Sequence, residues 1–298
     1  MKEVSVISVN YNGFPVTCEM IDSLHQIGFD GEIIVVDNGS RQNEAGLLSD
    51  KYPDIVAIRS EENLGFAGGN NLGIRKAKGR YLLLLNNDTT VTKGFLEPMI
   101  ERLDSSPEIG VVCPKILFEY APDTIQFAGY TPLHPITLRN HMVGFNQKDN
   151  GQFDKSASYP YAMGAAMLVK REVIDRAGEM PESYFLYYEE LDWSQRIREA
   201  GYSIWYESRA RIFHKESIAT GKMSPLKQYY LTRNRLYFVK RNVRGLNVVF
   251  ALFYQLFIST GKNCVMFLLQ RRFDLFRATV RGVIHGMKMI LGYDTKYN

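Results

Sequence analysis

Asp88 is the first side chain whose position suggests chemistry. It follows the apolar run 81–85 (YLLLL) and two amides, Asn86 and Asn87. A carboxylate directly after a buried strand commonly caps a helix, holds a hydroxyl or binds a metal. The threonines after Asp88 could cap the next helix equally well, so capping does not require an aspartate there. We therefore expect a hard cation, Mg2+ or Mn2+, held by this carboxylate and by substrate phosphates.

His214 ends another short strand pattern, residues 210–214 (ARIFH). A neutral imidazole at such a position could ligate a metal. A single histidine is more often structural, although this one ends a strand as Asp88 does. The residues alone leave both interpretations open.

The second acidic cluster consists of Glu189, Glu190 and Asp192, directly after the aromatic run 184–188 (YFLYY). On a helix Glu189 and Asp192 share one face, and Glu190 is rotated from Glu189 by roughly 100°. Acidic residues also favour helix N-termini through the macrodipole, and this is the simpler interpretation of the cluster. The aromatic run favours a walled pocket over a solvated face.

These side chains need a scaffold, and the first hundred residues alternate β-rich runs with helical patterns. The pattern predicts a parallel sheet covered by helices on both faces. In such sheets ligands bind at the carboxyl ends of the strands. All four predicted strands end in small polar residues: NYNG, DNGS, ENLGFAGGNN and NND. We expect helices over 15–28 and 67–78, with a polar helix between the second and third strands, and strands over 4–9, 32–36, 55–60 and 81–85.

The glycine-rich loop 63–73 (NLGFAGGNNLG) has neither the G-x-G-x-x-G spacing nor a following Lys-Ser/Thr. A nicotinamide-dependent or P-loop enzyme is therefore disfavoured. The glycines at this helix start would let backbone approach a ligand closely, and the amide groups would favour an anion. Tight strand-to-helix packing is the competing interpretation for either Gly68 or Gly69 alone.

Beyond residue 107 the alternation fails. Residues 119–159 are rich in proline, glycine and aromatic residues without a clear period, and we expect an irregular insertion that shapes a binding surface. Regularity returns over 161–178 as a strand and a short helix closed by a glycine. A helix from about 189 to 201 and two short strands, 202–207 and 210–214, follow.

The C-terminal part differs in charge. Residues 221–298 carry 14 lysines and arginines against two acidic residues, a net +12, whereas residues 1–220 carry −8. The apolar stretch 245–270, whose one charge is Lys262, precedes a basic amphipathic pattern over 271–291. Such helices suit an anionic membrane surface. A helical cap packed on the enzyme is the alternative, and a full membrane span is disfavoured because residues 261–263 interrupt the apolar run.

Composition and cysteine usage indicate a globular intracellular protein. With 298 residues and 45% apolar residues the chain can bury a large core. The first residues show no apolar signal-peptide core, and the three scattered cysteines form neither a disulfide framework nor a metal-knuckle spacing. We expect a cytoplasmic location, peripheral on the inner face of the cell membrane, and no nucleic-acid partner.

Taken together, the motifs SVISVNYNG, IIVVDNGS, ENLGFAGGNNLGI, GRYLLLLNND, GAAMLVKREV and YEELDWSQRIREAGYSIWYESRARIFH resemble the inverting glycosyltransferases of family 2, in particular the rhamnosyltransferase-like bacterial branch. The resemblance covers about residues 3–240. It implies the α/β nucleotide-diphosphosugar transferase (GT-A) fold, with a Rossmann-like, mostly parallel sheet and helices on both faces. The catalytic domain would span 1–220, with a nucleotide-binding half (about 1–115) and an acceptor half (about 116–220), before a helical extension over 221–298.

The resemblance also implies roles for single residues. The family's D-x-D motif falls on residues 86–88, with Asp88 as metal ligand; Asn86 departs from the strict pattern. The catalytic base falls on Glu190, where the family usually has Asp, so Glu189 and Asp192 stay alternatives. His214 would complete the metal shell, as in some relatives. The nucleotide would contact Asn10, Tyr11, Asp37, Asn63, Gly65, Asn86 and Asn87.

The implied function is metal-dependent inverting transfer of rhamnose or another hexose from a dTDP- or UDP-sugar. The acceptor would be a cell-surface polysaccharide or a lipid-linked glycan. A sugar-nucleotide pyrophosphorylase is one alternative, although the early loop NYNGFP lacks the Arg and Lys that would bind a triphosphate. A catalytically inactive relative that binds glycans or a partner transferase is the other.

Overall fold

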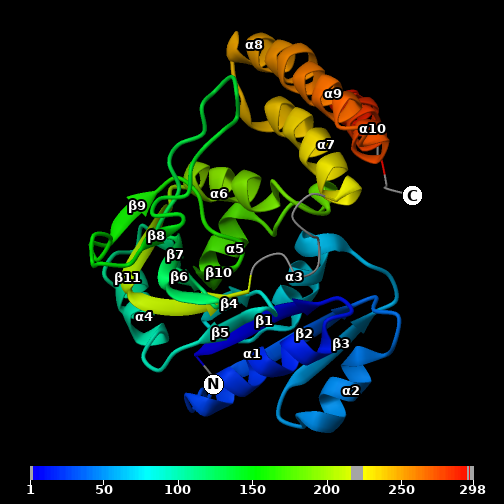
Figure 1. The fold of residues 1–298 in the computed structure, drawn as a ribbon. Helices are drawn as coiled ribbons and strands as arrows, with labels where there is room; N and C mark the ends of the chain where they lie inside the picture. The colour runs from blue at the N-terminus through cyan, green and yellow to red at the C-terminus, as the bar shows by residue number, and fades with distance from the viewer. Residues whose placement is uncertain (1–2, 216–223, 294, 296–298) are drawn as a thin grey trace.

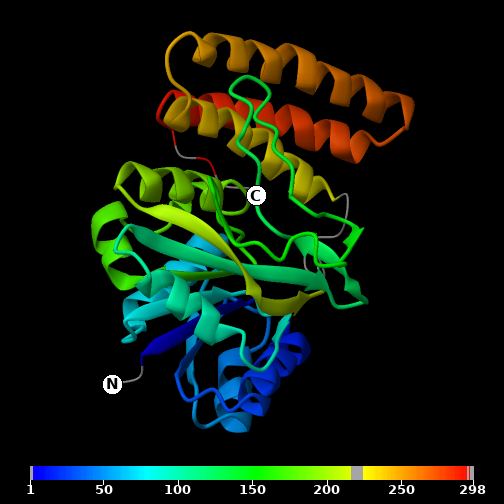
Figure 2. The same ribbon diagram turned by 90° about the vertical axis from the view of Figure 1, so that its left-hand side faces the viewer.

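A computed structural model describes residues 3–215, 224–293 and 295. Within these residues the chain forms a central sheet with helices on both sides and a helical layer at the C-terminal end (Figures 1 and 2). The predicted boundary between catalytic domain and extension, at residue 220, lies outside the described residues.

The first half alternates strands and helices as predicted. Strands β1 to β4 run parallel in the order β3-β2-β1-β4, with Asn10 of β1 beside Asp37 of β2. Side-chain alternation is absent from β4 because both of its faces are covered, and all five of its residues are buried. The elements are β1 (Val4–Asn10), α1 (Phe14–Gln26), β2 (Glu32–Asn38), α2 (Glu44–Lys51), β3 (Val56–Ser60), α3 (Gly65–Lys76) and β4 (Tyr81–Leu85).

The second half makes the sheet mixed. β10 runs antiparallel between β4 and β6, β11 is parallel to β6, and β5 closes the edge antiparallel to β11. The GT-A fold predicted from the sequence is confirmed. In the second half of the sheet, however, most neighbouring strands are antiparallel. The elements are β5 (Thr89–Val91), α4 (Leu96–Asp104), β6 (Ile109–Phe118), β7 (Ala121–Phe127), β8 (Gln147–Lys148), β9 (Ala157–Tyr159), β10 (Ala166–Lys170), α5 (Arg171–Ala177), η1 (Glu182–Tyr184), α6 (Glu189–Glu199) and β11 (Ser203–His214).

Two predictions in this half are wrong in detail. The two short strands expected over 202–207 and 210–214 are one strand, β11, with a register shift between Glu207 and Arg211. The predicted irregular insertion contains regular structure, since β7 pairs with β6 and β8, and β9 pairs with β11. β11 therefore pairs with β6 on both sides of a bulge at residues 208–210.

The C-terminal extension is helical, as predicted, and packs on the catalytic part. Its described part consists of three helices: α7 (Pro225–Asn242), a continuous helix with a π-helical centre, and α10 (Phe273–Ile290). The continuous helix comprises α8 (Asn247–Phe253), η2 (Tyr254–Ser259) and α9 (Thr260–Leu269). Figures 1 and 2 show α7 between α6 and the outer helices. By length and composition alone, residues 247–269 are also long and apolar enough to cross a membrane.

A hydrophobic cluster separate from the main core joins the C-terminal helices to the residues around the acid cluster. It unites Leu138 of the insertion, Tyr184, Tyr188 and Leu191 around the start of α6, and Phe238 with further residues of α7 and α8. Gln255 in the π-helical segment donates to the backbone oxygens of Ile136 and Thr137. The extension and the insertion are thus packed together above α6.

Candidate active site

Asp88 and His214 lie side by side at one edge of the sheet. The Oδ1 atom of Asp88 is 3.0 Å from the Nε2 atom of His214, because β5 begins at Thr89 and pairs in register with the end of β11. The two residues predicted as metal ligands are 126 positions apart in the sequence, and the sheet brings them together. No group of three His, Cys, Asp or Glu side chains that could hold a metal occurs among the described residues.

The hydrogen bonding of His214 fits a metal ligand. Its buried Nδ1 atom lies 2.7 Å from Oε1 of Gln126, which can only accept, so Nδ1 carries the proton. The other nitrogen, Nε2, is buried and makes no hydrogen bond, although Asp88 lies beside it. An imidazole held at Nδ1 by an amide oxygen, with Nε2 next to a carboxylate, is an arrangement typical of a histidine ligand. The pair thus fits Mg2+ or Mn2+ if phosphates and water supply the remaining ligands.

Asn10 and Asn87 belong to one hydrogen-bond network near Asp88, because both bind the Thr17 hydroxyl. Oδ1 of Asn10 accepts from Thr17 Oγ1 at 2.8 Å, and Nδ2 of Asn87 donates to the same hydroxyl at 2.9 Å. Asn10 also donates to Glu44 at 2.7 Å. Asn86 donates its backbone N–H to the Ala165 carbonyl at 2.9 Å. The strand ends are therefore tied to one another by short polar side chains, and direct nucleotide contacts of Asn10 would compete with this network.

Asp37 is fully buried and paired. Its Oδ2 atom accepts from Arg59 at 2.7 Å and its Oδ1 atom accepts from the Ser40 backbone at 3.0 Å. A nucleotide could therefore reach the Asp37 carboxylate only if Arg59 moved. Tyr11, in contrast, is 47% exposed at the end of β1 and free to stack on a base.

The glycine-rich loop is built close against the acid cluster. Asn63 accepts from the Gly65 backbone at 2.9 Å, and Gly65 adopts φ +73°. A Cβ atom on Gly65 would lie 2.1 Å from the carbonyl oxygen of Phe185, so only glycine fits there. The next residue, Phe66, donates its N–H to that same oxygen at 2.7 Å. The loop after β3 and the segment before α6 are thus in direct backbone contact.

Glu189 and Glu190 place two carboxyl groups side by side, with Glu189 buried and Glu190 half-buried. Desolvation raises the pKa of Glu190 to about 7, and burial, then the neighbouring Glu190 charge, raises the pKa of Glu189 well above its ordinary value. Oε2 of Glu189 is buried without a hydrogen-bond partner. Burial, then the Glu190 charge, also raises the pKa of Tyr130, which lies beside it. A carboxylate near pKa 7 suits a general base at neutral pH.

Gly164 lies between this pair and the sheet edge that carries Asp88 and His214. A Cβ atom there would lie 3.5 Å from the ring of Phe66 and 4.0 Å from Cγ of Glu190. The following residue, Ala165, accepts the Asn86 N–H noted above. Glu190 therefore faces the same rim of the sheet as residues 86–88, across a glycine.

Asp192 has a different environment. Its carboxylate is 1% exposed and is bound by Arg241, Asn242 and Tyr184 at 2.7, 2.8 and 2.9 Å. Burial alone would raise the pKa of Asp192, but the donors from α7, Arg241 foremost, outweigh it and lower the pKa. Its carboxylate oxygens are engaged, so Asp192 ties α6 to α7.

Several residues of this site had no signal in the sequence. Gln126 lies in a short alternating strand, and Arg59 follows an ordinary apolar run. Arg241 and Asn242 belong to a helix that the sequence marked only as basic. Their partners became visible only once the fold placed them.

The sheet topology and this rim define a glycosyltransferase of the GT-A class. The chain belongs to glycosyl transferase family 2, whose family model matches residues 5–178. Over 97% of its length it is 24% identical to the low-salt glycan biosynthesis hexosyltransferase of Haloferax volcanii, of which it covers 92%. Over 64% of its length it is 21% identical to the N-acetylglucosaminyl-diphospho-decaprenol L-rhamnosyltransferase of Mycobacterium tuberculosis, covering 68% of that enzyme.

Solved structures share the fold. GalNAc-T7 with UDP, GalNAc and Mn2+ superposes with a TM-score of 0.63 at 15% identity, over 86% of this chain and 54% of that one. The mannosyltransferase PcManGT from Pyrobaculum calidifontis, in complex with GDP-Man and Mn2+, superposes with a TM-score of 0.58 at 15% identity, over 98% of this chain and 87% of that one. Divalent metal and a nucleotide thus accompany this fold in both neighbours.

Proposed function

We propose that the protein transfers a hexose, with inversion, from a nucleotide-diphosphate sugar to a glycan or lipid-linked glycan. The observation that carries this proposal is the Asp88–His214 pair, whose buried imidazole nitrogen has a free lone pair beside a carboxylate. Such a pair at the strand ends suits a cation shared with the donor diphosphate. The family's inverting chemistry requires a base nearby, and Glu190 lies on the same rim.

Asp88 and His214 would hold Mg2+ or Mn2+, which would neutralise charge on the departing diphosphate. Gln126 keeps the His214 imidazole in the tautomer that presents Nε2. Tyr11 would stack on the nucleotide base, and Asn63 and Gly65 would border the ribose through the loop after β3. Asn86 and Asn87 shape the turn that carries Asp88. Asp37 would act on the nucleotide indirectly, through Arg59.

Glu190 would accept the proton of the acceptor hydroxyl as that oxygen attacks the anomeric carbon. Its pKa of about 7 leaves a substantial share of the carboxylate ionised at neutral pH. Glu189 and Glu190 would not both be fully ionised, because each carboxylate disfavours ionisation of the other. Asp192 is the least suited of the three acids, since its oxygens are already bound by α7.

Donor binding tests the proposal directly. We expect a thermal-shift panel of nucleotide diphosphates and their sugars to show a stabilising donor only with Mg2+ or Mn2+, and Asp88→Ala to abolish that shift. dTDP-rhamnose and UDP-hexoses are the first donors to try. Leu47→Ala on α2 is the control variant. A donor that stabilises Asp88→Ala and the unchanged protein equally, with Mn2+ present, would contradict the metal role; failure of the pure protein to transfer or hydrolyse any bound donor would favour an inactive binding protein.

We further propose that the outer helices lie in the plane of an anionic membrane, on its cytoplasmic face. Of the 19 large hydrophobic side chains that are exposed, 14 fall between residues 246 and 293. Phe250, Phe253, Phe257 and Val265 recur at helical spacing along α8–η2–α9 and are 55 to 65% exposed. Only 17% of an 18-residue apolar window within this helix is buried. An apolar face of this extent is typical of an interaction surface.

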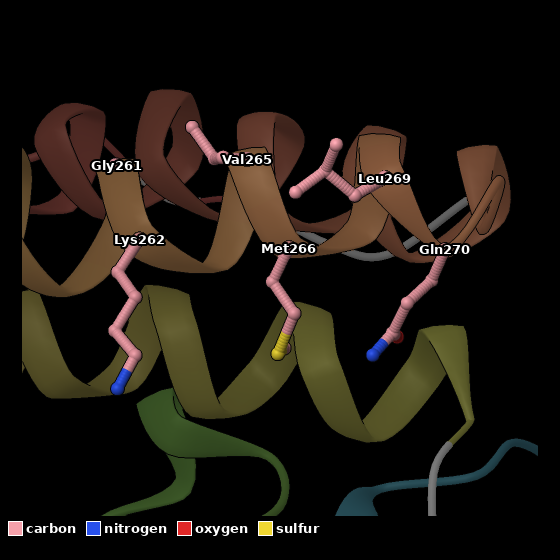
Figure 3. A pocket seen from close by; sticks show the side chains of 6 residues that line it. All are labelled: Gly261, Lys262, Val265, Met266, Leu269 and Gln270. Atoms are coloured by element: carbon pink, nitrogen blue, oxygen red, sulfur yellow. The ribbon is translucent and has the colours of Figure 1, made fainter.

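The charges around this face favour lipid over a second protein copy. Exposed basic residues border it, and Asp274, the one acid in 224–293, is paired with Arg272 at 2.8 Å. Figure 3 shows Val265 and Leu269 pointing away from α7, while Lys262 and Met266 point toward it. Apolar side chains would therefore face the acyl boundary, with cations near the headgroups. The exposed cations are Lys240, Arg244, Lys262, Arg271, Arg277 and Lys288.

Vesicle flotation tests this location. We expect binding to vesicles with about one third anionic lipid, weak binding to neutral vesicles, and release as salt rises, because surface attraction is screened within about 10 Å at 0.1 M salt. Phe250→Glu with Phe257→Glu should abolish flotation, whereas Leu47→Glu on α2 should not. Flotation of the double variant at wild-type level, or resistance of the wild type to carbonate extraction as for a spanning helix, would contradict in-plane docking.

A further inference from the structure

The turn that precedes the acid cluster has an unusual backbone. Phe185 adopts φ 64° and ψ −54°, and the Leu186 N–H donates to the Tyr184 carbonyl at 2.8 Å, which closes a γ-turn with positive φ. Tyr187 and Tyr188 also have positive φ, at 69° and 78°. Seven non-glycine residues in the described chain do so, and three of them lie here. Bulky side chains adopt such conformations only where their surroundings enforce them.

The enforcing contacts come from α7. Nδ2 of Asn234 lies 2.9, 2.7 and 2.8 Å from the carbonyl oxygens of Tyr184, Leu186 and Tyr187. Arg233 donates to the Tyr184 carbonyl at 2.5 Å and to Oδ1 of Asn234 at 2.8 Å. Both side chains are at most 1% exposed. The carbonyls of the turn are therefore gathered on one asparagine, which a second buried residue orients.

The turn is continuous with both halves of the proposed site. Its last residue, Tyr188, precedes Glu189 and Glu190 directly, and Arg235 binds the Tyr188 hydroxyl at 2.8 Å. Its Phe185 carbonyl receives the N–H of Phe66 in the first turn of α3. One short piece of backbone thus contacts the donor-side loop and carries the proposed base.

We propose that Asn234, oriented by Arg233, is a positioning residue for the transfer reaction. It holds the 184–188 turn so that Glu190 and the start of α3 keep a fixed relation to each other. This inference rests on the proposed function of Glu190. It assigns to the C-terminal extension a part in catalysis in addition to any part in location.

Asn234→Ala tests the assignment, with Gln228→Ala as its matched control. Gln228 is also an α7 amide, but it binds Thr232 and Thr279 and touches no part of the turn. We expect Asn234→Ala to lower kcat by about 10- to 100-fold, because small displacements of a catalytic group are costly. The acid limb of the pH–rate profile should move below pH 7 as water reaches Glu190. Exchange of the Phe66 amide should quicken by about tenfold or more.

Gln228→Ala should change none of these three quantities. Arg233→Lys, which keeps the charge but loses the guanidinium fork, provides a milder variant if Asn234→Ala does not fold. Equal Phe66 exchange in the Asn234 and Gln228 variants would show that the turn does not link α7 to α3, whatever the activity. Faster exchange with unchanged kcat and pH profile would overturn the positioning role.

The base assignment fails separately. If Glu190→Gln turns over normally while Asn234→Ala quickens Phe66 exchange, the turn is held as inferred and the proposed base is wrong. If both variants lose turnover and Gln228→Ala does not, both proposals are supported.

Discussion

The sheet edge that carries Asp88 and His214 and the acid cluster are built on opposite principles. At the edge, Asp88 lies in the turn directly before β5 and His214 ends β11, and their neighbours are short polar side chains within hydrogen-bond reach of one another. At the acid cluster, two carboxyls follow a turn of positive φ that is held from a helix about fifty residues later. The edge is rigid because of the sheet, and the cluster is rigid because of α7.

The difference teaches where each kind of chemistry can be placed. A metal ligand needs fixed distances, which paired strands supply. A base needs an environment that raises its pKa, and burial of two carboxyls under an aromatic turn supplies that. Changes at the two regions should therefore have different signatures, in binding for the edge and in turnover, pH dependence and stability for the cluster.

The largest expected effect is on turnover. Glu190→Gln should lower kcat by about 10² to 10⁴ while leaving donor affinity unchanged, because it removes proton transfer but keeps shape. Steady-state kinetics and calorimetry with Mn2+ measure the two quantities. Glu199→Gln, at the exposed end of the same helix, is the control. Normal turnover by Glu190→Gln would place the base elsewhere.

A smaller effect is expected on stability. Arg241→Ala should lower the free energy of unfolding by about 2 to 4 kcal/mol, because it leaves the buried Asp192 carboxylate with fewer donors. Denaturant titration measures it, and the exposed Arg244→Ala should change stability little. If both variants unfold at the same denaturant concentration, α7 contributes little to the cluster.

At the metal-binding edge we expect a change in binding alone. Gln126→Leu should weaken Mn2+-dependent donor binding by about 10- to 100-fold, because the His214 ring loses the acceptor that fixes its tautomer. Calorimetry measures this, with Gln195→Leu, a half-buried glutamine on α6, as control. Unchanged affinity would argue that His214 has a structural role only.

The smallest expected effect is the pH dependence of stability. The folded state keeps a proton on Glu190 up to about pH 7, whereas the unfolded chain loses it near pH 4.5. The stability that this proton contributes is fully present below pH 4.5 and is lost as pH rises through 7. Between pH 5 and pH 8, wild type should lose about 1 to 2 kcal/mol relative to Glu190→Gln, a value reduced from the full shift by partial exposure. Parallel stability curves for the two proteins would show that Glu190 titrates normally.

The edge could largely be predicted from the sequence. The run YLLLL predicts a buried strand, and a polar residue after it predicts the rim, because a parallel sheet aligns its carboxyl ends. Asp88 and His214 were recognised in this way as strand-end residues. Gln126 was missed because residues 119–159 were predicted to be an irregular insertion, and no local pattern reveals the partner of a glutamine.

The residues of the acid cluster were predicted, but the hydrogen bonds from α7 that fix the turn before it could not be. Nothing in the run around Asn234 shows that it binds carbonyls of residues 184–187, because this contact depends on how α7 packs. The two strands predicted over 202–207 and 210–214 likewise form one strand, in which Glu207 is buried and paired with Arg102 and Arg209 beside the bulge. Long-range pairing of polar side chains is invisible to local patterns.

Gly65 has a consequence for engineering the donor preference of the enzyme. Any side chain there would strike the Phe185 carbonyl, so a library randomised across the loop after β3 would be dominated by misfolded variants at this one codon. New specificities would have to come from Tyr11 or Asn63 with Gly65 held constant. Under the proposed function, a change of sugar and a change of acceptor would not be independent choices, because the loop after β3 and the turn before α6 meet at the backbone contact with Phe185.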